Sequence, residues 1–378
     1  MIHIRPGSQA GSLAAILSVV GEYPYSSLHL LGNERCLRRT VKKLTEKNVL
    51  YNSESGEKLF CKCLNLSGKG SGKTIRLYKD ALPILNWISS DAFSTYMHIS
   101  KNHKFSGDIW HIERNHRVAE AVAMCMRAGM EYRPYALPHL QNKKIISVIP
   151  NNVISFYPSW CLKNINQLEL NKTMYTRIVG AIFSHQKCFA IYNTRNALMR
   201  WNGMGEFKAL HNLIEIARWN ANIATIDSAI LFGRTNKVLL STLMANEQNS
   251  RVEFRFDGIY KHIHFIPLSD TGIRLLKIIC LPEVQRSLLN ILFESDSIAN
   301  GLGLFEYDAY VNQKYILSHL DGDVTRLIRF KEALLSNRYD SEVLCFDFQA
   351  DYVNAFLAGL ATVKVIEMSL VETELGLM

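Results

Sequence analysis

The sequence predicts a mixed fold, α+β or α/β, in which an N-terminal winged helix-turn-helix precedes a mixed-sheet α/β domain. Three observations predict it. The net charge of +9 of this 378-residue chain is concentrated in one N-terminal window. Short helical patterns followed by strand-like segments surround that window, and apolar strands alternate with helices further along. We assign residues 1–90 to the winged helix, 91–114 to a linker, and 115–378 to the α/β domain with an acidic C-terminal segment.

The positive charge is confined to a short stretch. Between Arg35 and Lys79 the chain has twelve Lys or Arg and three Glu, so this window accounts for the whole +9. Residues 340–378 have the opposite balance, with seven acidic residues and one Lys. A basic window on a neutral body indicates a local binding site for a polyanion such as DNA. The alternative is a basic face that is simply solvated.

Composition excludes several classes of protein. With 48% hydrophobic residues the chain is too apolar for a disordered polymer. Its apolar runs are shorter than the roughly 18–20 residues of a membrane span, so we expect no membrane partner. The first residues lack the apolar core of a secretory signal, and the eight Cys are irregularly spaced. We therefore expect reduced thiols and a cytoplasmic protein.

The basic window begins with three predicted helices, Leu13–Val20 after a Ser12 cap, Tyr25–Leu31 and Glu34–Lys47. The third helix has an apolar stripe of Leu37, Val41 and Leu44, the i, i+4, i+7 spacing of a core face. Most of its cations fall on the opposite side. One face of this helix is thus expected to be buried and the other to be strongly cationic.

Strands and a glycine-rich loop follow these helices. Strands are predicted at 49–52 and 58–66, joined by a turn at Ser55-Gly56, and at 74–78 after the loop Ser67–Lys73. In a winged helix-turn-helix the third helix enters the major groove of double-stranded DNA and the wing contacts phosphates. The predicted DNA-binding residues are Arg35, Arg38, Arg39, Lys42 and Lys43 on the helix, and Lys69, Lys73 and Arg76 on the wing.

Two alternatives to this interpretation exist. The segment could be a small helical domain whose basic face contacts the rest of the chain. Gly72-Lys73-Thr74 could also belong to a nucleotide-binding loop. However, Ser67 stands where that loop needs Gly, and Ile75–Tyr78 has the pattern of a strand where a long helix is required.

The remainder of the chain alternates strands and helices, which favours an α/β domain with a mixed sheet. Strands are predicted at 144–149, 153–157, 177–183, 188–192, 228–232, 261–266, 341–346 and 362–366. Helices are predicted at 115–128, 206–219, 235–244, 271–279, 282–293 and 352–358.

This order of elements resembles the replication-relaxation family of plasmids and integrative elements of Gram-positive bacteria. The matching features are Leu37–Leu44 with Leu50, the helix Asn115–Gly129, Phe156–Ser159, Cys188–Tyr192 and Gly205–Lys208. In that family a winged helix precedes a domain similar to PD-(D/E)XK nucleases, so the resemblance implies a restriction-endonuclease-like fold for the second part. It also implies DNA and replication or conjugation proteins as partners, and we add a homodimer to these expectations.

The chain departs from the nuclease pattern at the metal ligands. Such a nuclease binds Mg²⁺ through an Asp after Pro and an acid on the next strand, followed by a Lys. Here Ser159 follows Pro158, and Ala190-Ile191-Tyr192 holds neither an acid nor a Lys. The second domain is therefore expected to be degenerate, with no cofactor unless Mg²⁺ serves a surviving nuclease.

One Glu-x-Lys remains, at Glu206 and Lys208. The periodicity of 206–219 favours a helix, on which these two side chains point roughly 200° apart and form no joint site. In a strand they would share a face, and Asp227 could supply another acid. These three are the candidate catalytic residues of the alternative function.

His262 and His264 share one face of a predicted strand and could be two metal ligands. No carboxylate close to them in the sequence completes a ligand set, so packing or surface roles are the simpler interpretation.

The leading hypothesis is a DNA-binding protein of a mobile genetic element that is not an enzyme and acts in replication, DNA processing or transcriptional control. The alternatives are a Mg²⁺-dependent DNA endonuclease of PD-(D/E)XK type and a protein–protein interaction scaffold.

Overall fold

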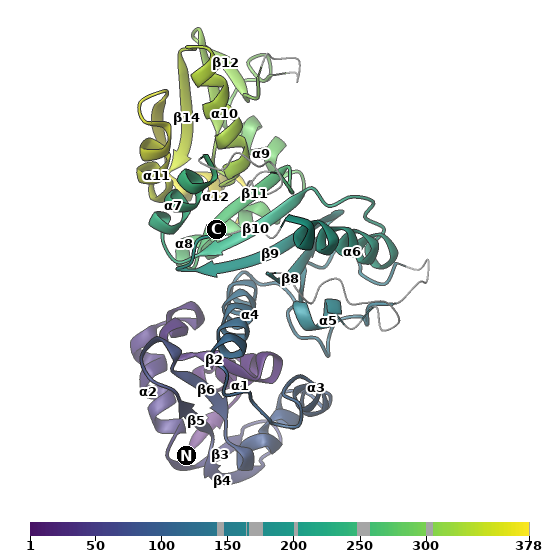
Figure 1. The fold of residues 1–378 in the computed structure, drawn as a ribbon. Coiled ribbons are helices and arrows are strands. Elements are labelled where there is room, and N and C mark those ends of the chain that lie inside the picture. Colours follow the sequence, from purple (N-terminus) through teal and green to yellow (C-terminus); the bar gives the residue numbers. More distant parts are fainter. Residues whose placement is uncertain are drawn as a thin grey trace. The chain divides into compact units, whose positions relative to one another are not determined.

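The computed structural model describes residues 1–141, 147–163, 165, 177–199, 203–247, 258–299 and 305–377. The chain divides into two compact units (Figure 1). The first comprises residues 1–170 and 179–182, and the second comprises residues 171–178 and 183–378. This division does not coincide with the predicted boundary at residues 91–114. At the coarse level the prediction is confirmed, because both units combine helices with sheets that are mixed or antiparallel.

The first unit, purple through blue to teal in Figure 1, interleaves helices with short strands. Its helices are α1 (Gln9–Val20), η1 (Tyr25–Leu31), α2 (Glu34–Leu44), η2 (Gly70–Gly72), η3 (Lys79–Trp87), α3 (Ala92–Ile99), α4 (Ile109–Arg127) and α5 (Ser159–Lys163), where η marks 3-10 helices. Its strands are β1 (Ile2–Ile4), β2 (Glu22–Pro24), β3 (Lys47–Asn52), β4 (Lys58–Lys62), β5 (Leu64–Ser67), β6 (Thr74–Leu77) and β7 (Ser155–Pro158).

Two small sheets lie beside the helices of this unit. One has the order β1-β3-β4 and the other the antiparallel order β2-β6-β5. The predicted turn at Ser55-Gly56 joins β3 to β4, where Gly56 has a φ of +74°. The sequence did not predict β2, the short strand that follows α1 and pairs with β6.

Amphipathic patterning explains the helices. Leu37, Val41 and Leu44 of α2 are buried, as the stripe predicted, and α2 ends at Leu44 because β3 begins three residues later. Helix α1 begins earlier than predicted, since its N-cap is Ser8, whose hydroxyl accepts a hydrogen bond from the Gly11 backbone N–H. Ser12 therefore lies inside the helix.

The stretch predicted as a linker is partly helical and packed. Helix α3 lies within it, α4 begins in it at Ile109, and α3 packs against α1. Ala92 and Tyr96 of α3 are both fully buried. The Tyr96 hydroxyl lies 2.7 Å from His103 Nδ1. A helix this short with two fully buried positions has no clear periodicity, so the sequence pattern missed it.

The second unit, teal to yellow in Figure 1, alternates strands and helices along most of its length. Its strands are β8 (Ile178–Ser184), which the division splits, β9 (Lys187–Arg195), β10 (Ser228–Gly233), β11 (His262–Pro267), β12 (Ala309–Val311), β13 (Lys314–Ser318), β14 (Ser341–Phe346) and β15 (Thr362–Ile366). Its helices are α6 (Gly203–Ala221), α7 (Asn236–Glu247), α8 (Asp270–Ile279), α9 (Val284–Leu292), α10 (Val324–Ser336), α11 (Asp347–Leu357) and α12 (Met368–Glu374).

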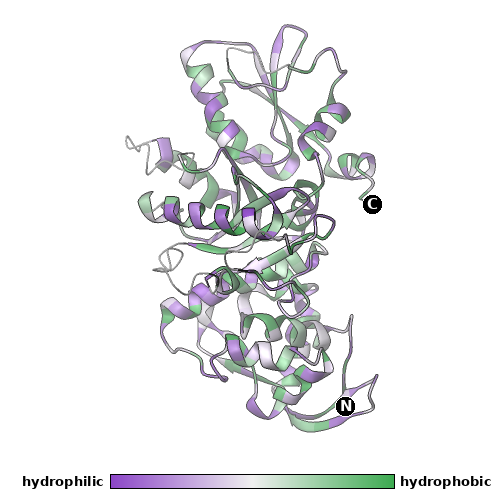
Figure 2. Ribbon diagram, turned by 90° about the vertical axis from the view of Figure 1, so that its right-hand side faces the viewer, coloured by the Kyte–Doolittle hydropathy of each residue, from purple (hydrophilic) through white to green (hydrophobic). Residues whose placement is uncertain are grey.

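A five-stranded sheet has the order β11-β10-β9-β8-β7, and a four-stranded sheet has the order β12-β13-β14-β15. Strand β10 is parallel to β9 and β11, and β14 is parallel to β13 and β15. Every residue of β8 and β10 is buried. Figure 2 colours hydrophobic stretches green, and strands in the middle of the view are among them. Continuous apolar strands of this kind are typical of a sheet covered on both faces.

Most predicted elements of the second unit are present. The helices α10 and α12 and the strands β12 and β13 were missed. The strand predicted at 144–149 lies partly outside the described residues. No described helix is both long and apolar enough to cross a membrane.

Candidate nucleic-acid interface

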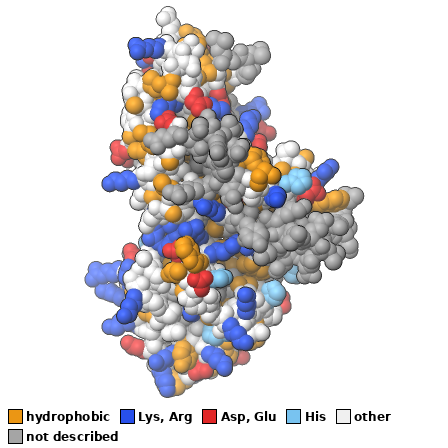
Figure 3. Space-filling model, viewed as in Figure 1, with side chains coloured by type: hydrophobic (Ala, Val, Ile, Leu, Met, Phe, Trp, Pro, Cys, Tyr) orange, Lys and Arg blue, Asp and Glu red, His pale blue; other side chains and the backbone are white. Residues whose placement is uncertain are grey.

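Helix α2 presents a stripe of cations to solvent. Its N-cap Asn33 accepts a hydrogen bond from the Cys36 backbone N–H, which fixes where the helix starts. The exposed cations occupy positions i, i+3, i+4, i+7 and i+8, and they are Arg35, Arg38, Arg39, Lys42 and Lys43. Figure 3 shows Lys and Arg side chains gathered on the side of the first unit where α2 lies. Burial of Leu37, Val41 and Leu44 on one face of α2 therefore turns the cations on the opposite face toward solvent.

Most of these cations have no acidic partner. Arg38 is the exception, because its guanidinium donates to Glu34 Oε1 at 2.6 Å. Hydrogen bonds to Glu34 and then to Tyr25 raise the pKa of Arg38. Within the described chain, no carboxylate forms an ion pair with the other four cations of the stripe. Their charge is therefore available to an external anion.

Tyr25 links α2 to the loop between β5 and β6. The Arg38 guanidinium carbon lies 4.8 Å from the centroid of the Tyr25 ring, and Lys73 Nζ lies 4.6 Å from the same centroid. Cations at this distance from a ring are attracted by its electron-rich face. Two positive charges from separate segments are thus gathered around one half-buried ring.

The loop itself is shaped by glycine. Gly68 has a φ of +78°, and a Cβ there would lie 2.6 Å from the Gly72 carbonyl oxygen. The loop can therefore fold back on itself only with glycine at this position. This geometry leaves Lys69 exposed. The segment after Lys73 is strand β6, so a helix-based nucleotide-binding loop is not formed.

Arg76 is placed differently from the other predicted DNA contacts. Its guanidinium donates to Glu22 Oε2 at 2.7 and 2.9 Å, and it stacks 4.5 Å over the Phe105 ring. The Glu22 side chain is only 2% exposed, and Asn115 donates to its other oxygen at 2.6 Å. Arg76 therefore neutralises a buried carboxylate, and we remove it from the candidate interface.

The hairpin β3–β4 adds cations that the site prediction omitted. Lys47 lies directly opposite Lys62 in the antiparallel pair, and both are exposed. Lys58 lies opposite Tyr51, with its Nζ 6.0 Å from the ring centroid. Like charges directly opposite each other destabilise a hairpin unless an anion lies between them. The sequence contained these lysines, but only the strand register pairs them.

The catalytic candidates do not form a common site. Segment 206–208 is helical, and Glu206 is fully buried whereas Lys208 is exposed. Glu206 accepts a hydrogen bond from the Tyr192 hydroxyl at 3.0 Å, and burial raises its pKa. Asp227 is exposed, and its carboxylate accepts from Ser228 at 2.7 Å. This arrangement gives the nuclease alternative no assembled acid–lysine pair.

The structure corrects the expectation that His262 and His264 lack carboxylates. His262 Nδ1 donates to Asp323 Oδ2 at 2.6 Å, and His264 Nδ1 donates to the Asp321 carbonyl oxygen at 3.0 Å. The two rings stack with centroids 6.4 Å apart. These acids lie some sixty residues downstream, so no local motif could reveal them.

Such hydrogen bonds orient imidazoles for metal binding or proton transfer. Burial would raise the pKa of Asp323, but His262, His264 and Thr325 outweigh it and lower that pKa. Among the described residues, no three His, Cys, Asp or Glu form a group that could hold a metal ion. We assign this cluster a structural role at the start of α10, where Asp323 accepts from the backbone N–H groups of Thr325 and Arg326.

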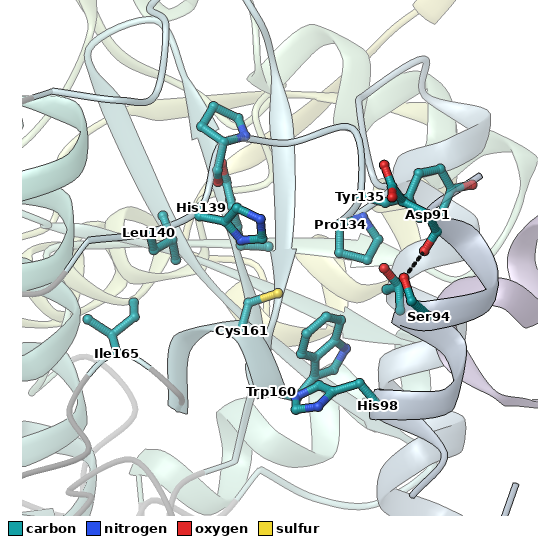
Figure 4. Close-up of a pocket in the computed structure, with 13 residues that line it drawn as sticks. Asp91, Ser94, His98, Pro134, Tyr135, His139, Leu140, Trp160, Cys161 and Ile165 are labelled. Carbon is teal, nitrogen blue, oxygen red and sulfur yellow. Dashed lines mark hydrogen bonds between the residues drawn. The ribbon is translucent and has the colours of Figure 1, made fainter. Parts of the chain in front are cut away.

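A cavity of about 500 Å³ in the first unit was not predicted. Figure 4 shows His98, His139 and Trp160 among its lining side chains, beside the half-buried thiol of Cys161. Burial raises the pKa of that thiol, so it is not a reactive thiolate. The Ser94 hydroxyl donates to the Asp91 backbone carbonyl at 2.9 Å. The lining mixes polar, apolar and aromatic side chains and selects no ligand chemistry.

Comparison of the chain with protein-family models, with curated proteins and with solved structures gave no match.

Proposed function

We propose that this chain is a DNA-binding protein of a mobile genetic element, acting in replication, DNA processing or transcriptional control. In this proposal α2 enters the major groove of double-stranded DNA, and the loop between β5 and β6 contacts the phosphate backbone as a wing. The first unit then serves as a winged helix-turn-helix, and the second as a scaffold without catalysis.

The observation that supports the proposal best is the meeting of Arg38 and Lys73 at the Tyr25 ring. A DNA-reading helix and a wing need their cations on one continuous surface, because the phosphates flanking a groove follow a fixed path. Tyr25 brings the two segments together from either side. Arg35, Arg39 and Lys42 then extend the cationic surface along α2.

The strand arrangement also favours the proposal. In the antiparallel sheet β2-β6-β5, β2, which precedes α2, pairs with β6, and β6 and β5 carry the loop between them. In a winged helix the wing is the connection between two such strands. The additional hairpin β3–β4, with Lys47 and Lys62 opposed, gives a second cationic edge for phosphate contacts.

The experiment is a fluorescence anisotropy titration of labelled duplex DNA at several salt concentrations. We compare the wild type with the triple variant Arg35→Ala/Arg39→Ala/Lys42→Ala. Each lost phosphate contact should reduce the slope of log K against log salt by about 0.9, so the triple variant should lose affinity and up to about three units of slope.

A matched control removes three exposed lysines from helices of the second unit, as Lys208→Ala/Lys237→Ala/Lys277→Ala. The control lowers net charge equally and should keep most of the affinity. Equal losses in the two triple variants would show that net charge alone attracts DNA, which contradicts a binding surface on α2. Absence of any salt-dependent binding by the wild type would also contradict the proposal.

A further inference from the structure

The sheet β1-β3-β4 has one face in the core of the first unit and one face in solvent. Ile4, Leu50 and Cys61 are buried on the inner face. Because side chains alternate between the two faces along a strand, the residues between these point outward. We call the outward surface of β3 and β4 the outer face. Its residues are exposed or half-buried, none is acidic, and they are Lys47, Val49, Tyr51, Lys58, Phe60 and Lys62.

Phe60 lies at the centre of the outer face. It is 68% exposed, and it lies directly opposite Val49 in the antiparallel pair. The next outward position on β3 is Tyr51, so these three side chains form a continuous apolar strip. A lone exposed ring is ordinary on a protein surface, whereas an apolar strip with a polar border is typical of a binding surface.

The second ring of the strip, Tyr51, is held in place by its neighbours. The His3 ring on β1 meets it edge-on, with centroids 5.1 Å apart and planes at 87°. His3 Nδ1 lies 3.0 Å from the Ser53 hydroxyl oxygen, which fixes the imidazole in turn. Lys58 Nζ lies 6.0 Å from the Tyr51 ring centroid. A side chain that is ordered before binding loses little entropy when a ligand binds.

Lysines border the strip at both ends. Lys47 and Lys62 are register partners at one end, and Lys58 lies at the other end. Across the described residues, none of these three lysines forms an ion pair with a carboxylate. The acids nearest to them in sequence lie in the connections at 45–46 and 53–57, outside the strands. Like charges directly opposite each other repel, and an anion bound between them converts that repulsion into attraction.

We propose that the outer face binds a single strand of nucleic acid, with a nucleobase stacked on Phe60 and phosphates bound by the lysines on either side. Along β4 the outward positions run cation, ring, cation, and a nucleic-acid strand likewise alternates flat rings with anions. A duplex keeps its base faces inside the stack, so it offers the Phe60 ring no stacking partner. The inference goes beyond the proposed function, because the outer face does not include α2 and does not need α2 to bind a strand.

A DNA strand and an RNA strand both offer this chemistry, so the test includes both. Labelled oligothymidylate and oligouridylate, which form no stable internal base pairs, are titrated by fluorescence anisotropy. The wild type should bind at least one of them, and the tighter complex identifies the kind of strand. Phe60→Ala should weaken that binding about tenfold, since stacking of a base on an aromatic side chain contributes that order of affinity.

Two further substitutions at Phe60 separate stacking from a general hydrophobic contact. Phe60→Trp keeps a π-face and should bind as tightly as the wild type or more tightly. Phe60→Leu keeps an apolar side chain without a π-face and should be nearly as weak as Phe60→Ala. Tyr310→Ala is the matched control, because Tyr310 is an exposed ring on β12, an outer strand of the four-stranded sheet. Urea titration of each variant checks that it is folded.

The role of the lysines is tested through the salt dependence of binding. Each phosphate contact on a single strand contributes about 0.7 to the slope of log K against log salt. Lys47→Ala/Lys62→Ala should therefore lower the slope by up to about 1.4. The control Lys208→Ala/Lys237→Ala removes two exposed lysines of the second unit and should leave the slope unchanged. Ultraviolet crosslinking of the bound strand gives an independent readout and should place a nucleotide on the peptide that contains Phe60.

Three results would overturn the inference. The first is a wild type that binds neither single strand. The second is an equal affinity in Phe60→Ala and Tyr310→Ala, or in Phe60→Leu and the wild type, because stacking on Phe60 would then contribute nothing. The third is Phe60-dependent binding to vesicles of phosphatidylserine and phosphatidylcholine without single-strand binding, which would assign the outer face to an anionic lipid surface.

The two proposals fail separately. The triple variant on α2 should lose duplex affinity and keep most of its affinity for the single strand. If it keeps full duplex affinity while single-strand binding depends on Phe60, only the proposed function fails. If duplex binding depends on α2 while single-strand binding is absent or independent of Phe60, only the present inference fails.

Discussion

Arg76 and Glu22 form a nearly dehydrated ion pair, with Arg76 17% and Glu22 2% exposed and their closest atoms 2.7 Å apart. The pair joins β6 to β2 across the antiparallel sheet, because the two residues are register partners. Arg76 was predicted to contact DNA from the wing, and its partner instead makes it a structural residue. Arg76 adds to the positive charge counted from the sequence, but its charge is neutralised by Glu22 and is not available to a ligand.

This pairing predicts that Arg76→Ala destabilises the fold. The change leaves the Glu22 carboxylate buried without its cation, which should cost about 3–5 kcal/mol of the free energy of unfolding in a urea titration. The double variant Glu22→Met/Arg76→Met should recover much of the loss, because it removes both charges. An Arg76→Ala protein that is as stable as the wild type but binds DNA weakly would return Arg76 to the interface.

Tyr25 is predicted to act through the two cations beside its ring. Tyr25→Leu should weaken duplex binding about fivefold, since the lost cation–π contacts are worth about 1 kcal/mol and the cations then lose their fixed positions. Tyr25→Phe keeps the ring and should bind nearly as the wild type does. Anisotropy titration at low salt measures both. Equal weakening in the two variants would attribute the effect to the hydroxyl group, against this explanation.

Glu34 is expected to oppose DNA binding at the proposed interface, because its carboxylate pairs with Arg38. Glu34→Gln removes the carboxylate that pairs with Arg38 and should tighten duplex binding about two- to fivefold at low salt. The same change removes a favourable first-turn acid and should cost about 0.5 kcal/mol of stability. Glu367→Gln, an equal change of charge at an exposed site of the second unit, is the control. Tighter binding in both variants would indicate a non-local charge effect.

A substitution at Glu206 tests whether its carboxylate has a structural role or binds a metal ion. Burial raises its pKa, against the opposing effects of Tyr192 and Arg177, so its charged form costs stability above the ordinary pKa of a glutamate. Glu206→Gln should therefore leave the free energy of unfolding at pH 7 within about 1 kcal/mol of the wild type or raise it. Incubation with DNA and Mg²⁺ checks the alternative. Cleavage by the wild type that this variant abolishes would support the nuclease.

His319 predicts how stability depends on pH. Burial, the largest cause, lowers its pKa to about 4, while Asp321 and Asp323 raise it and Arg326 and His264 lower it further. Because the folded-state pKa lies below the ordinary value of about 6.5, the unfolded chain binds the proton first as pH falls. The contribution of neutral His319 to the free energy of unfolding is complete above about pH 6.5 and is lost progressively as the pH falls towards 4.

The expected loss between those pH values is up to about 3 kcal/mol in the free energy of unfolding. His319→Gln should be less stable at pH 7 but should show a flatter dependence between pH 6.5 and 4. Urea titrations at several pH values measure this. Identical pH profiles for the two proteins would contradict the assignment to His319.

Local patterns predicted the elements that bury a regular stripe. The spacing of Leu37, Val41 and Leu44 predicted both the helix and its cationic opposite face, because a 3.6-residue period determines which side chains share a face. The apolar runs of β8 and β10 likewise predicted buried strands. Helix α3 and strand β2 were missed, since short elements with few buried positions carry too little periodicity.

The partners of each charge were decided by tertiary structure alone. Arg76 pairs with a residue 54 positions earlier, and His262 with an aspartate 61 positions later. The sequence by itself determined the amphipathic elements, the clustering of positive charge and the glycine-rich loop, because these follow from near neighbours. Folding brings distant segments together and so decides which cations stay unpaired, which lie beside Tyr25 and which form ion pairs with buried acids. Burial and desolvation then set the energy of each charge.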